Sequence, residues 1–112
     1  MDYLKEINKL RDEMHREIIR ETIHSTGANE NLALVLEEPI QFNLEHTRPG
    51  SRKGREDILI TGVDGNSNEL TGTNLDGEDR FIYYRDVPVE ILAILHRNVT
   101  GKCYTIEELV LC

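Results

Sequence analysis

The first two dozen residues carry apolar side chains three to four positions apart, the repeat of an amphipathic helix. Acidic and basic residues fill the positions between them, and the apolar stripe consists of Tyr3, Ile7, Leu10, Met14 and Ile18. The stripe ends near His24, and Gly27 follows at a position where helices commonly terminate. We therefore expect a long N-terminal helix within residues 1–26.

After residue 32 the pattern changes toward alternation, the repeat of a half-buried β-strand. Residues 39–46 alternate apolar and polar side chains, whereas the apolar run 32–36 is too short to assign by its period. Pro39 lacks an amide hydrogen, so we expect a strand edge or a bend at that position.

Three more strand-like segments follow, at 56–63, 69–75 and 80–87. The turns between them, at 64–68 and 76–79, both open on Asp-Gly, a dipeptide that tolerates the positive φ angles of tight hairpins. Short strands joined by short turns predict an antiparallel meander of four to five strands over residues 32–87.

The period changes again near the C-terminus. Asp86 and Pro88 stand where a helix start favours them, and residues 91–95 are apolar on nearly every side. We expect a short, buried helix that ends at Gly101.

The tail, residues 102–111, fits two alternatives. Thr105 and Glu108 have the spacing of a capping box, which favours a last helical turn. The segment 102–106 fits a closing strand equally well.

These elements predict an α+β fold in a single domain, residues 1–112. The N-terminal helix occupies 1–26, the antiparallel sheet 32–87, and the C-terminal helix and tail 88–112. The strand number and order are also those of a small SH3-like or Sm-like barrel, although such a likeness of fold licenses no function.

Charge separates one segment from the rest of the chain. The protein has 21 acidic and 13 basic side chains, a net charge of −8. Residues 48–55 contain four basic residues and no acidic one, and these are Arg48, Arg52, Lys53 and Arg55. A basic loop on an acidic body suits either phosphate groups or the acidic surface of another protein.

Candidate chemistry elsewhere is sparse. Glu21 and His24 form one ExxH pair, but a di-iron centre needs two such pairs and further carboxylates. The segment from Asp64 resembles the start of a calcium loop, yet it has Glu69 where glycine is required and Leu75 where a bidentate Glu is required. No nucleophile–base or phosphate-loop motif occurs. We expect no metal, no cofactor and no enzymatic activity.

The cysteines and the N-terminus bear on the compartment. Cys103 and Cys112 fit neither a CxxC pair nor a prenylation signal, so we expect two reduced thiols. The charged N-terminus lacks the apolar core of a signal peptide, and no apolar run approaches a membrane span. We expect a cytoplasmic protein without membrane contact.

The sequence thus favours a non-enzymatic interaction or assembly module that binds a protein partner or forms a homodimer. The basic loop would make its electrostatic contact and the N-terminal apolar stripe its apolar contact, unless that stripe packs on the protein's own sheet. The alternative is nucleic-acid or phosphate binding through residues 48–55. Phe81 and Tyr83, which share one face of a strand, would then supply base stacking.

Overall fold

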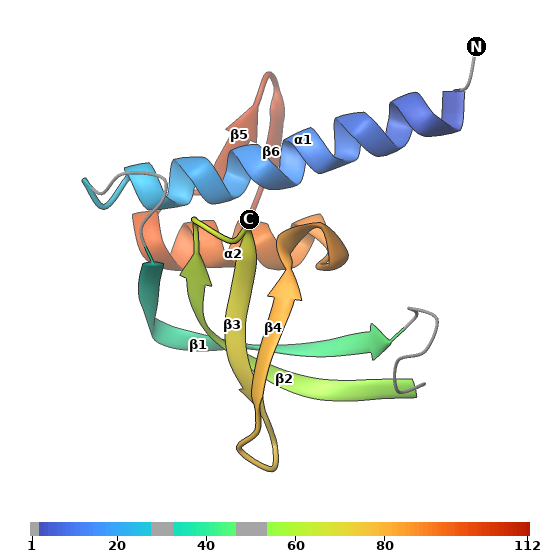
Figure 1. Ribbon diagram of the computed structural model, residues 1–112. Helices are drawn as coiled ribbons and strands as arrows, with labels where there is room; N and C mark the ends of the chain where they lie inside the picture. Colours follow the sequence, from blue (N-terminus) through green and yellow to red (C-terminus); the bar gives the residue numbers. More distant parts are fainter. Residues whose placement is uncertain (1–2, 28–32, 47–53) are drawn as a thin grey trace.

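The structure, a computed structural model, describes residues 3–27, 33–46 and 54–112, with the side chains of 3–11 and 46 outside that description. The fold is α+β, as expected. Its elements are α1 (Tyr3–His24), β1 (Ala33–His46), β2 (Gly54–Asp64), β3 (Glu69–Asn74), β4 (Asp79–Tyr83), the 3-10 helix η1 (Tyr84–Asp86), α2 (Val89–Thr100), β5 (Tyr104–Ile106) and β6 (Leu109–Leu111). Figure 1 shows α2 between α1 and the four-stranded sheet.

The main sheet is an antiparallel meander in the order β1-β2-β3-β4, which confirms the predicted topology. The two segments that flank Pro39 are not separate strands, because β1 runs continuously from Ala33 to His46. Its register with β2 shifts between Val35 and Ile40, and Figure 1 shows the strand bending there. An irregularity at this point lets proline sit in a strand without breaking a regular ladder.

The sheet is open, so the barrel is not confirmed. Within the described residues β1 and β4 each pair with one neighbour only and do not meet each other. β3 pairs with β2 from Ile58 onward, while β1 and β2 stay paired as far as His46 and Gly54. Residues 43–46 and 54–57 therefore form a two-stranded ribbon that extends past β3 (Figure 1).

The core lies between α2 and the inner face of the sheet. The sheet contributes a row of aliphatic side chains that are at most 4% exposed, namely Ile58, Ile60, Leu70 and Ile82. Leu92 and Leu95 of α2 are fully buried, and Ile18 of α1 completes the cluster. Burial of each such side chain contributes about 1.5–3 kcal/mol to the free energy of folding. The nearly all-round apolar character of α2 follows from its central position.

Polar contacts attach α1 to the end of the sheet. The buried imidazole of His15 lies with Nε2 2.8 Å from the carbonyl oxygen of Val87. The next residue, Arg16, donates from Nε to the hydroxyl of Tyr84 at 3.0 Å. The fourth strand is shorter than predicted, because residues 84–86 turn into η1 and bring Tyr84 and Val87 to these partners.

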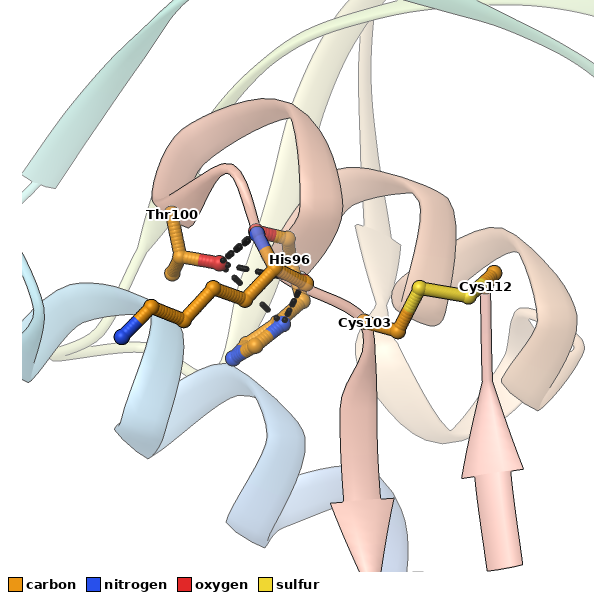
Figure 2. Close-up of a disulfide and its surroundings, with 5 residues drawn as sticks. His96, Thr100, Cys103 and Cys112 are labelled. Atoms are coloured by element: carbon orange, nitrogen blue, oxygen red, sulfur yellow. Dashed lines mark hydrogen bonds between the residues drawn. A yellow bond between two sulfur atoms is a disulfide. The ribbon is translucent and has the colours of Figure 1, made fainter.

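The C-terminal segment resolves the alternative that the sequence leaves open. Gly101 terminates α2 in the left-handed conformation, with φ 77°, as predicted. The chain then forms a hairpin of β5 and β6, and no helical turn occurs at 105–108. Cys103 and Cys112 flank this hairpin and form a disulfide (Figure 2), so the expectation of two reduced thiols was wrong.

None of the helices in the described part of the chain combines the length and the apolar character that a membrane span requires.

Candidate interaction surface

Strand β4 presents an outward row of side chains on the face of the sheet opposite the core. Asp79, Phe81 and Tyr83 alternate with the inward Arg80 and Ile82. Phe81 is 67% exposed and Tyr83 is 40% exposed. Just beyond the strand, the guanidinium carbon of Arg85 lies 5.3 Å from the centroid of the Tyr83 ring. We call Asp79, Phe81, Tyr83 and Arg85 the β4 row.

Neighbouring strands continue this surface across the sheet. Thr71 pairs with Phe81, and Thr73 stands between Asp79 and Leu59 in the register. Leu59 is 41% exposed, which is unusual for a leucine in a central strand. Two exposed aromatic rings and a leucine, separated by threonines, make a surface of the kind that marks an interaction site.

The two ends of the β4 row carry opposite charges. The exposed side chains of Asp79 and Arg85 form no ion pair with another described residue. Arg85 keeps a cation–π contact with Tyr83, which holds the guanidinium over the aromatic part of the row. The order from the start of β4 into η1 is therefore negative, aromatic, aromatic, positive.

The backbone of β4 adds a second binding feature. The strand lies at one edge of the sheet, and in the described residues it pairs only with β3. Its outer edge carries N–H and C=O groups that can form a ladder with another strand. The short length of the strand, five residues, limits such a ladder to a few hydrogen bonds.

The predicted electrostatic loop is placed only in part. Arg48, Arg52 and Lys53 lie outside the described residues, and Arg55 lies in the ribbon. Its Nε donates to the side-chain oxygen of Asn43, and its Nη1 lies 3.5 Å from Oε2 of Glu45. Arg55 is thus partly neutralised by its own chain.

The predicted apolar contact is divided between the core and undescribed side chains. Tyr3, Ile7 and Leu10 belong to α1, but their side chains lie outside the description. Met14 is partly buried against the core, and Ile18 is fully buried in it. These two residues pack within their own chain, in the core cluster, and α2 lies between α1 and the sheet on which the sequence left packing open.

The calcium-like segment is a hairpin turn that one carboxylate stabilises. Oδ1 of Asp64 accepts hydrogen bonds from the backbone N–H groups of Asn66, at 3.0 Å, and Ser67, at 3.3 Å. Hydrogen bonds from the Ser67 side chain and from these amides lower the pKa of Asp64 below its ordinary value. No cluster of three or more potential metal-ligating side chains occurs in residues 12–27, 33–45 and 54–112.

Sequence reasoning identified the aromatic pair but missed both charges. The sequence pattern places Asp79 in a turn and Arg85 inside a strand, and neither position predicts an alignment with Phe81. The signal available was the spacing of two between residues 79, 81, 83 and 85.

No protein-family model matches the chain, and neither a curated protein nor a solved structure shows significant similarity to it.

Proposed function

We propose that the protein is a self-associating interaction module whose β4 row pairs with the same row of a second copy. The observation that carries the proposal is the order of the row, in which Asp79 and Arg85 flank two exposed aromatic residues. Such a row is complementary to itself when two copies run antiparallel. Complementary charges of this kind fix the orientation of a complex and favour one partner over others.

A twofold axis near Ile82 satisfies every member of the row at once. Asp79 of each copy then faces Arg85 of the other, and the aromatic residues meet at the centre. This is an isologous contact, the commonest arrangement in homodimers. The free edge of β4 lets the two sheets join through backbone hydrogen bonds, a recurring mode of protein recognition.

The expected energies decide which members matter most. An aromatic pair contributes about 0.5–1.5 kcal/mol beyond its buried area, whereas an exposed ion pair contributes about 0–1 kcal/mol. The rings therefore supply affinity and the charges supply register. A stable dimer also buries about 1,000 Å² or more, so further contacts are needed beyond β4. The first turns of α1, with Tyr3, Ile7 and Leu10, stay candidates for that area.

Sedimentation equilibrium of the wild-type chain and the Phe81→Ser variant tests the proposal. We expect the wild type to approach twice the chain mass of 12.9 kDa at tens of micromolar, and the variant to remain near 12.9 kDa. Leu75→Ser is the matched control, because Leu75 is 83% exposed but lies in the turn outside the row. A monomeric wild type, or an equal loss of mass in both variants, would reject the role of the row.

Nucleic-acid or phosphate binding is the second candidate, and the two exposed aromatic rings favour it as a stacking surface. Two acidic side chains oppose it: Asp57 and Asp79 stand on the same face of the sheet as the rings. A strand of phosphates that joined the rings to the loop at 48–55 would be repelled by both. Fluorescence anisotropy with labelled oligonucleotides at low salt checks this candidate, which requires binding that weakens as salt is added.

A further inference from the structure

A pocket of about 470 Å³ lies where α1 and α2 both end, beside the start of β5. Its polar lining residues are Glu21, Ser25, His96, Thr100, Lys102 and Thr105. The disulfide fixes one wall, because Cys103 also lines the pocket and is bonded to Cys112 (Figure 2). None of these residues belongs to the β4 row, so the pocket is independent of the proposed function.

His96 supplies a hydrogen-bond acceptor in this pocket. His96 is 4% exposed, and its ring nitrogen Nδ1 lies 3.1 Å from the carbonyl oxygen of Lys102. A carbonyl oxygen can only accept, so Nδ1 carries a proton, and in the neutral ring Nε2 then has a free lone pair. Figure 2 shows the second ring nitrogen of His96 pointing toward α1, and Nε2 has no hydrogen-bond partner in the described part of the chain.

Glu21 brings a negative charge to the same space. It lines the pocket from α1, the helix toward which the second ring nitrogen of His96 points. The ring of Tyr104 meets the His96 ring edge-on, with centroids 5.5 Å apart. Burial, followed by the nearby carboxylates of Glu21 and Glu17, raises the pKa of the Tyr104 phenol. The charge of Glu21 is therefore felt at Tyr104, whose ring contacts His96.

The helix ends reinforce this charge. Ser25 follows the last turn of α1 and Thr100 is the last residue of α2, so the pocket faces two helix C-termini. The carbonyl end of a helix carries a partial negative charge, which favours cations. Lys102 is the one cation among the lining residues, and it is exposed on a flexible side chain. Among the polar lining residues His96 is buried, whereas Glu21 and Lys102 are both exposed at the mouth of the pocket.

We propose that this pocket binds a small primary ammonium ion, whose N–H groups donate to Glu21 and to Nε2 of His96. Without such a ligand the Nε2 acceptor of His96, a residue only 4% exposed, has no partner, and a buried polar atom without a partner is costly. A ligand with N–H donors satisfies this acceptor and matches the charge of Glu21. An anion would meet two acceptors and two negative helix ends.

An NMR titration of the oxidised, full-length, ¹⁵N-labelled protein tests the proposal, with the ring nitrogens of His96 as the readout. Methylammonium chloride is the probe, and tetramethylammonium chloride is its control because it has the same charge and no N–H donor. We expect a saturable change at Nε2 with the first salt only. Equal changes with both salts, or none with methylammonium, would overturn the proposal.

Variants locate the site. Glu21→Gln keeps the shape of the side chain and should weaken methylammonium binding at least about tenfold, because the acceptor loses its negative charge. Glu108→Gln removes an exposed carboxylate from the β5–β6 turn and should leave binding unchanged. Lys102→Ala removes a competing ammonium group, so affinity should stay the same or rise. Unchanged binding in Glu21→Gln, or weaker binding in Lys102→Ala, would contradict the assignment.

Discussion

The two faces of the four-stranded sheet differ in what their apolar side chains contact. On the inner face, Ile60 and Leu70 are fully buried against the helices. On the outer face, Leu59 and Phe81 occupy the intervening positions and remain 41% and 67% exposed. The inner residues stabilise the fold. The outer residues contribute little to it, so their apolar character points to a contact outside the chain.

Substitutions on opposite faces of β3 should differ most in their effect on the free energy of unfolding. Leu70→Ala should lower the free energy of unfolding by about 3 kcal/mol, because it leaves a cavity in the core. Thr71→Ala, one position along on the outer face, should change it by less than about 0.5 kcal/mol. Urea unfolding at low protein concentration measures both values. Similar losses in the two variants would show that the outer face is also buried.

The next largest effect on stability should come from Gly72, where β3 lies very close to β2. A Cβ atom at Gly72 would lie 2.3 Å from the carbonyl oxygen of Leu59, which is backbone and has little freedom to move. Gly72→Ala should therefore cost about 2 kcal/mol, in the range of overpacked substitutions. Thr73→Ala serves as the control. A stability equal to the wild type would mean that the sheet adjusts its register without penalty.

The Asp64 turn fixes which residues face inward, and its contribution should depend on pH. The pKa of Asp64 is lowered in the folded protein, so the carboxylate stabilises the fold at pH values above its unfolded pKa. This contribution is lost as the pH falls through the lower, folded pKa. The stability difference between wild type and Asp64→Ala should accordingly shrink on acidification. A difference that grows toward low pH would contradict the assigned cause.

Phe81→Ser should have the smallest effect on the stability of the single chain. Because the ring is 67% exposed, its removal should change the free energy of unfolding by less than about 0.5 kcal/mol in dilute solution. The same substitution should abolish self-association. Thermal unfolding at two protein concentrations separates these effects, since only a dimer gains stability with concentration. A large loss in the dilute sample would place Phe81 in the core instead.

Local patterns predicted those elements whose residues agree with their surroundings. The apolar stripe gave the helix at the N-terminus, and alternation with Asp-Gly turns gave the meander, because each follows from side-chain periodicity. Pro39 suggested a break between two apolar segments, but both belong to β1, because an irregular register with β2 accommodates the proline. The hairpin at 104–111 is flanked by the disulfide of Cys103 with Cys112, a pairing that spacing alone does not determine.

The candidate surface was visible only in part for a similar reason. Phe81 and Tyr83 alternate within a clear strand, so their shared face could be predicted. Asp79 is the first residue of β4, after a turn in which the Asn74 N–H donates to the Glu78 carbonyl. Arg85 belongs to η1, where the Tyr84 N–H donates to the carbonyl of the distant Asn68. The basic loop, apart from Gly54 and Arg55, lies outside the described residues, so its role stays a prediction.

A charge exchange tests the antiparallel pairing of the β4 row most directly. Asp79→Arg and Arg85→Asp should each be monomeric, because each variant opposes like charges at both ends of the interface. An equimolar mixture should form a heterodimer, in which every position 79 again faces an opposite charge at position 85. Sedimentation equilibrium should therefore give about 12.9 kDa for each variant alone and about twice that mass for the mixture. Dimers of either variant alone, or a mixture that stays monomeric beside a dimeric wild type, would contradict the account.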